Sequence, residues 1–179
     1  MSHISYLKSH ISSLKSNSGF TLLEVIISLG IIVVGLVGAL TLVNFTLNSS
    51  GTSSSKLVAA NLAQEGIEVV RSSRDTSNNW TSWYNSISNG SYRASINLAN
   101  YKWTMISDST PHEEKLRFDS NTGLYFYEPS GSGSLTSFSR DIAIATGPNG
   151  EKQLTSEVKW QERNRSHSLK VVSYLYNWK

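Results

Sequence analysis

The pattern of hydrophobic and polar positions divides the chain into three stretches. In the first, residues 25–43, no residue is charged and apolar side chains dominate. These nineteen residues match the about 20 that an α-helix needs to cross the hydrocarbon core of a membrane. We therefore expect this stretch to form a membrane-spanning helix.

The second stretch, residues 56–74, has the spacing of an amphipathic helix. Its apolar positions recur every three or four residues, at Ala59, Leu62, Ala63, Ile67, Val69 and Val70. Gln64, Glu68 and Arg71 lie away from that face. Between the two stretches, residues 48–55 read as a linker by composition. We expect one long helix, with Gly51 as the point of bending or fraying, that ends around residues 72–74.

The third stretch, from residue 75 onward, consists of short segments typical of β-strands. We expect strands at 92–98, 101–107, 115–118, 124–127, 138–145, 153–160 and 168–178. Before them, residues 75–90 form a polar connection in which Trp80, Trp83 and Tyr84 anchor the loop over the sheet. The predicted fold class is α+β, a long N-terminal helix packed on an antiparallel β-sheet.

Turn residues separate these strands. Residues 119–123, Asp-Ser-Asn-Thr-Gly, predict a hairpin turn in which Gly123 takes a positive φ. The same residues resemble the start of a calcium loop, but the next acid is Glu128 and a turn explains them fully. We expect a flexible loop at 130–134 and a tight turn at 147–150.

Residues 161–167 are expected to form the tip of the last hairpin. They include Arg163 and Arg165. Either these arginines are solvated loop charges or they contact a partner.

Charge and cysteine content exclude several functional classes. The formal charge is +3, from 16 basic and 13 acidic residues. Lys8 and Lys15 stand in an acid-free N-terminal segment, so the rest of the chain carries 14 basic against 13 acidic residues. Such a balance gives little support to nucleic-acid binding, although a role in DNA uptake stays open. Without cysteine the chain has no disulfide, thiolate nucleophile or cysteine metal site.

Candidate catalytic groups are few. His112-Glu113-Glu114 is the one cluster that suggests metal or acid–base chemistry, but it lacks the second histidine of a zinc motif. We interpret it as a surface loop, and we interpret Glu65 and Glu68 as solvated helix charges. No serine stands in a Gly-x-Ser-x-Gly elbow. We expect neither an enzyme, nor a cofactor, nor a metal site.

Glu24 is the most informative single residue, because it stands at the entrance of the uncharged stretch. A charge inside a membrane is costly and marks a functional site that needs a partner. A secretory signal peptide cut near Ala39 does not account for an apolar run that continues through Val43. An uncleaved signal anchor, with the cytoplasm on the lysine side, does not explain Glu24 or the abrupt junction at Gly19–Phe20.

Residues 19–25, Gly-Phe-Thr-Leu-Leu-Glu-Val, together with the basic leader and the apolar stretch, resemble the prepilin processing motif of type IV pilins and type II secretion pseudopilins. The resemblance implies cleavage after Gly19 by a prepilin peptidase and N-methylation of Phe20. It also implies that Glu24, the fifth mature residue, meets the terminal amine of a neighbouring subunit. Gly30, Gly35 and Gly38 then either permit close bundling of helices or are ordinary membrane-helix glycines.

Softer resemblances point to a minor pilin or to the I-type minor pseudopilin. They lie at 60–71, at 138–144 and in the last hairpin, and the cysteine pair of many major pilins is missing. The resemblance implies other pilin or pseudopilin subunits as partners, with an assembly platform and a motor ATPase acting indirectly. The alternative is an uncleaved membrane-anchored adhesin or receptor.

The expected organisation has four parts. They are a leader (1–19), the transmembrane half of the helix (20–45), its amphipathic half (46–74) and an extracytoplasmic β-rich domain (75–179). The resemblance places the protein in the inner membrane as a single-pass subunit before it enters a surface or periplasmic filament.

Overall fold

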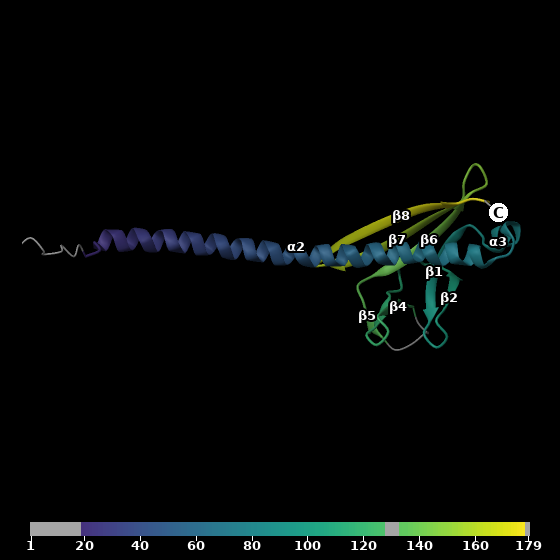
Figure 1. Ribbon diagram of the computed structural model, residues 1–179, viewed down its shortest axis with the longest axis horizontal. Coiled ribbons are helices and arrows are strands. Elements are labelled where there is room, and N and C mark those ends of the chain that lie inside the picture. Colours follow the sequence, from purple (N-terminus) through teal and green to yellow (C-terminus); the bar gives the residue numbers. More distant parts are fainter. Residues whose placement is uncertain (1–18, 128–132, 178–179) are drawn as a thin grey trace, which may run out of the picture. The chain divides into compact units, whose positions relative to one another are not determined.

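The computed structural model describes residues 19–127 and 133–177. It has the expected α+β architecture, a long helix and an antiparallel sheet (Figure 1). The elements are α2 (Leu22–Thr76), α3 (Trp80–Ser86), β1 (Gly90–Asn97), β2 (Lys102–Ser107), β3 (Arg117–Asp119), β4 (Leu124–Phe126), β5 (Ser134–Leu135), β6 (Ser139–Thr146), β7 (Lys152–Glu162) and β8 (Arg165–Leu175). The chain divides into two compact units, residues up to Asn48 and residues from Ser49 onward.

Helix α2 runs without interruption through residues 48–55, so the interpretation of that segment as a linker was wrong. Helix formation is cooperative, and helical segments on both sides override the weak propensity of a short serine-rich stretch. Within the segment the hydroxyl of Ser53 donates to the carbonyl of Ser49, 2.9 Å away. The hydroxyl of Thr52 lies 3.4 Å from Oε1 of Glu162 in β7 and donates to it.

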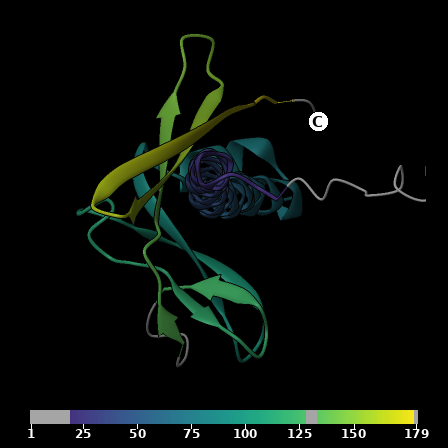
Figure 2. The ribbon, with the colours of Figure 1, turned by 90° about the vertical axis from the view of Figure 1, so that its left-hand side faces the viewer.

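Two antiparallel sheets form the second unit. The five-stranded sheet has the order β2-β1-β6-β7-β8, and the smaller one has the order β4-β3-β5. β7 and β8 pair in register along their whole length, from Lys152 opposite Leu175 to Glu162 opposite Arg165. Figure 2, which looks along α2, shows the strands of the larger sheet curving around one side of the part of α2 that belongs to the second unit.

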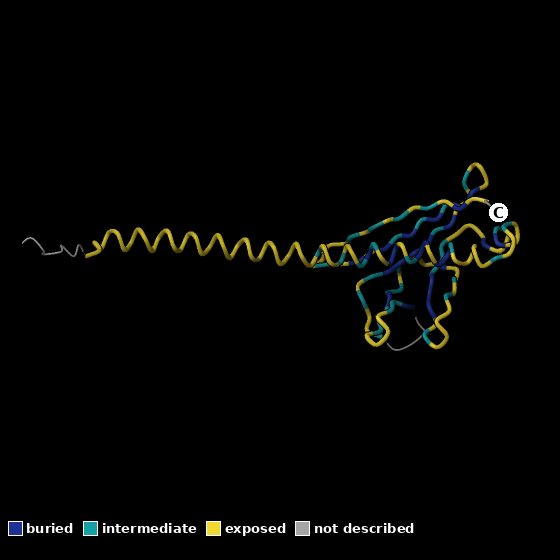
Figure 3. Tube along the Cα trace, in the orientation of Figure 1, coloured by how far each residue is buried: buried dark blue, intermediate teal, exposed yellow. Residues whose placement is uncertain are grey.

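The core lies between the sheet and the second half of α2. The buried helix residues are Ala59, Leu62, Ala63, Gly66, Ile67, Val69 and Val70, which contain every position of the predicted apolar face. One cluster joins Ile67 and Val70 to Ile142, Ile144 and Leu154. A second cluster surrounds Trp160. Figure 3 shows this burial beginning in the second unit.

All seven predicted strands are present, with ends that shift by up to three residues. Two short elements were missed, α3 and β5. α3 lies in the predicted polar connection, where the side chain of Asn79 caps it by accepting from the amides of Thr81 and Ser82. The element is buried through Trp83, which is 4% exposed, so it is held by one aromatic rather than by a periodic apolar face.

The predicted turns are confirmed where the structure describes them. Gly123 has φ 72° and Gly150 has φ 81°, the left-handed region that glycine adopts at no steric cost. The carboxylate of Asp119 accepts from the amide of Asn121 and the hydroxyl of Thr122 within its own turn. The backbone hydrogen bond from Asn121 is the main reason why the pKa of Asp119 lies below its usual value.

The last hairpin turn is shorter than expected. Arg163 and Asn164 alone form it, both with positive φ, so β7 and β8 extend into the predicted tip. Of the predicted flexible loop, residues 130–132 lie outside the described residues, and Ser134 begins β5.

Gly66 permits the close approach of α2 to the sheet. A Cβ at this position would lie 2.6 Å from Oγ of Ser156 and 3.2 Å from Cδ of Arg140. By contrast, a Cβ at Gly51 in the same helix would meet one atom, Oε1 of Glu162 at 3.5 Å. The close packing of α2 on the sheet therefore requires a glycine at position 66 but not at position 51.

We predict that Gly66→Ala lowers the free energy of unfolding by about 1–3 kcal/mol, because overpacking forces the helix away from β7. Gly51→Ala is the matched control and raises that free energy by up to about 1 kcal/mol, through better helix propensity. Chemical denaturation of both variants measures the difference. A Gly66→Ala protein as stable as the wild type would contradict the close-approach argument.

Candidate functional site

Glu24 lies in the first turn of α2. The helix begins at Leu22, and Thr21 precedes it. The hydroxyl of Thr21 accepts from the amide of Glu24 at 3.3 Å, and its carbonyl accepts from the amide of Val25 at 3.1 Å. Thr21 is thus the N-cap of α2, and Thr-Leu-Leu-Glu is the start of a capping box. The Thr-x-x-Glu spacing in the sequence already indicates this cap.

The position of Glu24 has an electrostatic consequence. Carboxylates are stabilised near helix N-termini, where unpaired amide groups carry partial positive charge. Within residues 19–127 and 133–177, the carboxylate of Glu24 forms no ion pair. Its charge is therefore available to a partner outside the described chain.

The helix that follows Glu24 presents apolar side chains on all its faces. Exposed fractions of the large apolar residues between Phe20 and Leu47 run from 43% at Val25 to 80% at Leu22 (Figure 3). Among the described residues, α2 is the helix long and apolar enough to cross a membrane. A helix that is apolar all round requires lipid or other helices around it.

Polar side chains in this part of α2 are satisfied by the helix itself. The hydroxyl of Thr41 donates to the carbonyl of Val37 at 2.8 Å, and the amide of Asn44 donates to the carbonyl of Leu40 at 3.0 Å. Such back-bonding removes the need for water, so these residues do not oppose burial in an apolar environment. A Cβ built at Gly30, Gly35 or Gly38 would have no neighbouring atom within 4 Å. These glycines leave flat places where another helix can approach closely.

A second polar centre lies inside the globular unit, around Arg140 of β6. The Arg140 side chain is fully buried. Its Nη1 donates to the carbonyl of Leu62 at 3.0 Å and to Oε1 of Glu65 at 2.5 Å, and its Nη2 donates to the carbonyl of Ala94 at 2.7 Å. The guanidinium therefore joins α2 to β1 and β6.

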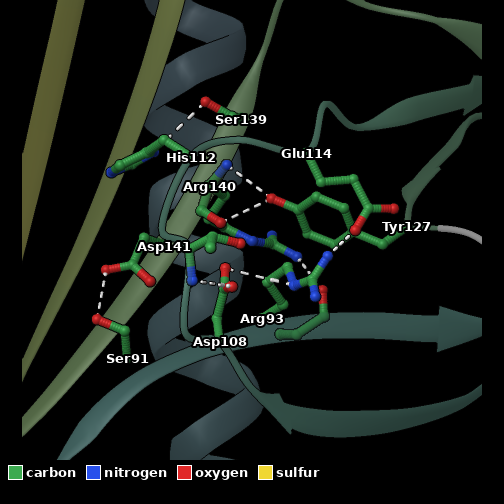
Figure 4. Close-up of polar contacts among 11 residues, drawn as sticks. Ser91, Arg93, Asp108, His112, Glu114, Tyr127, Ser139, Arg140 and Asp141 are labelled. Atoms are coloured by element: carbon green, nitrogen blue, oxygen red, sulfur yellow. Dashed lines mark hydrogen bonds and ion pairs between the residues drawn. The ribbon is translucent and has the colours of Figure 1, made fainter.

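Tyr127 completes this centre from the smaller sheet's side (Figure 4). Its hydroxyl donates to the carbonyl of Arg140 at 2.6 Å and accepts from the amide of Arg140 at 2.8 Å. Burial raises the pKa of Tyr127, with the nearby Arg140 acting in the opposite direction. A neutral phenol that both donates and accepts is what this position needs.

Glu65 is therefore not a solvated helix charge, and that prediction was wrong. Its carboxylate pairs with Arg140, whereas Glu68 forms an exposed ion pair with Arg71. The sequence itself indicates that Arg140 is buried and needs a carboxylate partner. Arg140 alternates with Ile142 and Ile144, so it faces the core with them, and a buried cation requires a carboxylate.

The predicted surface loop at 112–114 is also more enclosed than expected. The ring of His112 lies 3.3 Å from Oε2 of Glu157 and 3.4 Å from Oγ of Ser139. The carboxylate of Glu114 pairs with Arg93, which also lies 3.3 Å from Asp108. The loop thus packs on the face of the sheet opposite α2, and its charges have structural partners.

Asp141, like Asp108, is a buried acid of this layer. The hydroxyl of Ser91 donates to its Oδ2 at 3.3 Å, and its Oδ1 has no hydrogen-bond partner among the described residues. Burial raises the pKa of Asp141, and the nearby His112 acts against that shift. Within residues 19–127 and 133–177, no group of three His, Asp or Glu side chains has a metal-binding arrangement. The contacts of His112, Glu114 and Asp141 join the loop to the sheet face.

We predict that Glu65→Ala lowers the free energy of unfolding by about 3 kcal/mol, because it leaves the buried Arg140 charge without its carboxylate. Glu68→Ala, one turn further along the same helix, should cost less than about 1 kcal/mol, as exposed ion pairs do. Urea denaturation of the two variants makes the comparison. Equal losses would mean that the Arg140 contact does not hold α2 in place.

A pH-dependent prediction concerns Asp141. Because its pKa is raised in the folded state, its contribution to stability is full below the ordinary value and is lost as pH rises through the raised value. Asp141→Asn removes this loss, so the variant should be more stable than the wild type at pH 7. The advantage should disappear as pH falls below 3.8, where the wild-type carboxyl is protonated in both states. Unfolding curves across this pH range test the sign, and a variant that is less stable at pH 7 would refute it.

Comparison with known proteins gives one match. Residues 14–40 match the family model described as the prokaryotic N-terminal methylation motif. The match includes Gly19, Phe20 and Glu24 and ends inside the apolar part of α2. No curated protein and no solved structure gives a significant match to the chain.

Proposed function

Because the chain carries the prokaryotic N-terminal methylation motif, the signal of type IV pilins and pseudopilins, we propose that it is a minor pilin or pseudopilin subunit that works by assembly into a membrane-anchored filament. The observation that carries the proposal is a fully exposed apolar helix with one carboxylate in its first turn. The family of this motif is structural rather than enzymatic.

Gly19 and Phe20 form the proposed processing site. Both are exposed and precede the first helical residue, so the bond between them lies outside the helix. A peptidase must hold its substrate in an extended form, and glycine offers the least steric hindrance. We propose that a prepilin peptidase cuts this bond and that the new amine at Phe20 is N-methylated.

Cleavage would create a new positive charge at Phe20, and the carboxylate of Glu24 can pair with it. The new amine is a cation next to the positive end of α2, where cations are unfavourable and carboxylates are favourable. In an apolar filament core, an isolated charge of either sign is costly. When subunits are staggered, Glu24 of one subunit meets the Phe20 amine of its neighbour, and the pair fixes their register. Neither charge needs to be left alone in lipid.

The proposed partners follow from this arrangement. Before assembly the subunit is a single-pass protein of the inner membrane with its globular unit outside the cytoplasm, and other pilin or pseudopilin subunits then surround its apolar helix. An assembly platform and a motor ATPase supply the energy. The assignment as a minor subunit is supported by the lack of the cysteine pair of many major pilins.

N-terminal sequencing and intact mass of the protein extracted from membranes test the processing step. The expected product begins at N-methylated Phe20. A chain that retains Met1 would instead indicate an uncleaved anchor, and thus a tethered adhesin or receptor. A chain that begins near Leu40 would indicate a secreted protein. Either result overturns the proposal.

A second experiment tests the role of Glu24. Glu24→Gln removes the charge but keeps the size of the side chain, so cleavage and methylation should continue while incorporation into sheared filaments falls at least tenfold. Glu68→Gln, which removes an exposed carboxylate from the same helix, is the control and should assemble normally. Normal incorporation of the Glu24→Gln protein would refute the pairing.

A further inference from the structure

A cavity of about 290 Å³ lies on the face of the larger sheet opposite α2. Its lining includes His112, Lys115, Ser139 and Lys159. Ser139 pairs with Lys159, which pairs in turn with Ser168, and cross-strand partners share one face of a sheet. The cavity therefore gathers side chains from β6, β7, β8 and the segment before β3.

The lining consists of groups that can donate hydrogen bonds. It holds two lysine amines, the hydroxyls of Ser139, Ser166 and Ser168, and the imidazole of His112. None of the described lining residues carries a carboxylate. An arrangement of two cations and several hydroxyls that point from different strands suits an anion with several oxygens.

The nearest acid does not neutralise this charge. The carboxylate of Glu157 has Lys170 at 3.6 Å and the ring of His112 at 3.3 Å, while Lys159 is the most distant partner at 3.8 Å. Glu157 therefore shares one negative charge between two lysines, Lys159 and Lys170. Lys115 forms no ion pair with any residue that the structure describes. The positive charge of Lys115 and Lys159 beside the cavity thus exceeds the negative charge that Glu157 supplies.

One residue of the cavity lining, His112, has an unusual backbone conformation. His112 has φ 69°, which is uncommon for a residue other than glycine. Its ring is fixed between Ser139 and Glu157, and the Ser139 side of this contact is visible in Figure 4. Ser139 is fully buried. Backbone strain that the surrounding contacts maintain is a feature of binding sites.

We propose that this cavity binds a phosphate group, with Lys115 and Lys159 pairing with its charge and the hydroxyls of Ser166 and Ser168 donating to its oxygens. A phosphate has several strong acceptor oxygens arranged tetrahedrally, which fits donors from β7, β8 and the segment before β3 better than a planar carboxylate does. The source is free phosphate or a small organic phosphate. The site lies outside the segment of the methylation motif. The proposal of phosphate binding therefore does not depend on the filament proposal.

The test is isothermal titration of the full chain in detergent micelles with sodium phosphate, glycerol 3-phosphate and sodium acetate at constant ionic strength, since salt screens such contacts. The expected result is saturable binding of both phosphates at one site and no binding of acetate. Tighter binding of glycerol 3-phosphate would identify an organic phosphate as the source, and equal affinities would identify free phosphate.

Lys115→Gln and Lys159→Gln should each weaken phosphate binding by about tenfold, the size of a lost charge-assisted hydrogen bond. Lys170→Gln is the matched control, because it removes an amine at a similar distance from Glu157 without lining the cavity, and it should change the affinity less than twofold. Thermal unfolding checks that all three variants are folded. Absence of saturable phosphate binding, acetate binding of equal strength, or an equal loss in Lys170→Gln would overturn the proposal.

Discussion

The buried guanidinium of Arg140 is the contact on which the globular unit depends. It binds the carbonyl of Leu62 and the carboxylate of Glu65 on α2, and the carbonyl of Ala94 on β1. A buried cation that loses its carboxylate is strongly destabilising, so helix and sheet are held in one relative position rather than in a range of sliding packings. Gly66 acts in the same place, because the absence of a side chain lets the helix reach Arg140 and Ser156. Two neighbouring residues of α2, Glu65 and Gly66, therefore explain why the second half of the helix sits where it does.

Periodicity alone predicted most of this fold. The helix face and the seven strands depend on the alternation of apolar and polar positions, which local sequence records directly. Prediction from periodicity failed where a tertiary contact decides the local structure. Residues 48–55 are helical because their neighbours are helical and because Thr52 reaches Glu162, a contact across 110 residues. Glu65 was mistaken for a solvated charge because its partner, Arg140, is also remote in sequence, 75 residues away. The alternation of Arg140 with Ile142 in the sequence indicates that Arg140 faces the core. It does not indicate which carboxylate pairs with Arg140.

The candidate site at the N-terminus, in contrast, depends on a local sequence motif rather than on tertiary contacts. Gly19, Phe20 and Glu24 were predicted as site residues from a short local motif, and the match of residues 14–40 to the prokaryotic N-terminal methylation motif includes all three. The structure adds that Thr21 caps α2 and that Glu24 occupies the first turn. The chain thus combines a globular unit, in which the buried Arg140 is paired with Glu65, with an apolar first half of α2 whose one carboxylate, Glu24, has no ion pair among the described residues.

The central claim is that the Glu24 carboxylate of one subunit contacts the Phe20 amine of another. Solid-state NMR of filaments that contain two labelled pools tests it most directly, with ¹³C at the Glu24 carboxyl in one pool and ¹⁵N at Phe20 in the other. The account predicts a through-space correlation in the mixed filaments, consistent with an ion pair whose nitrogen and oxygen lie within about 4 Å. Absence of that correlation, in filaments shown to contain both pools, would contradict the account.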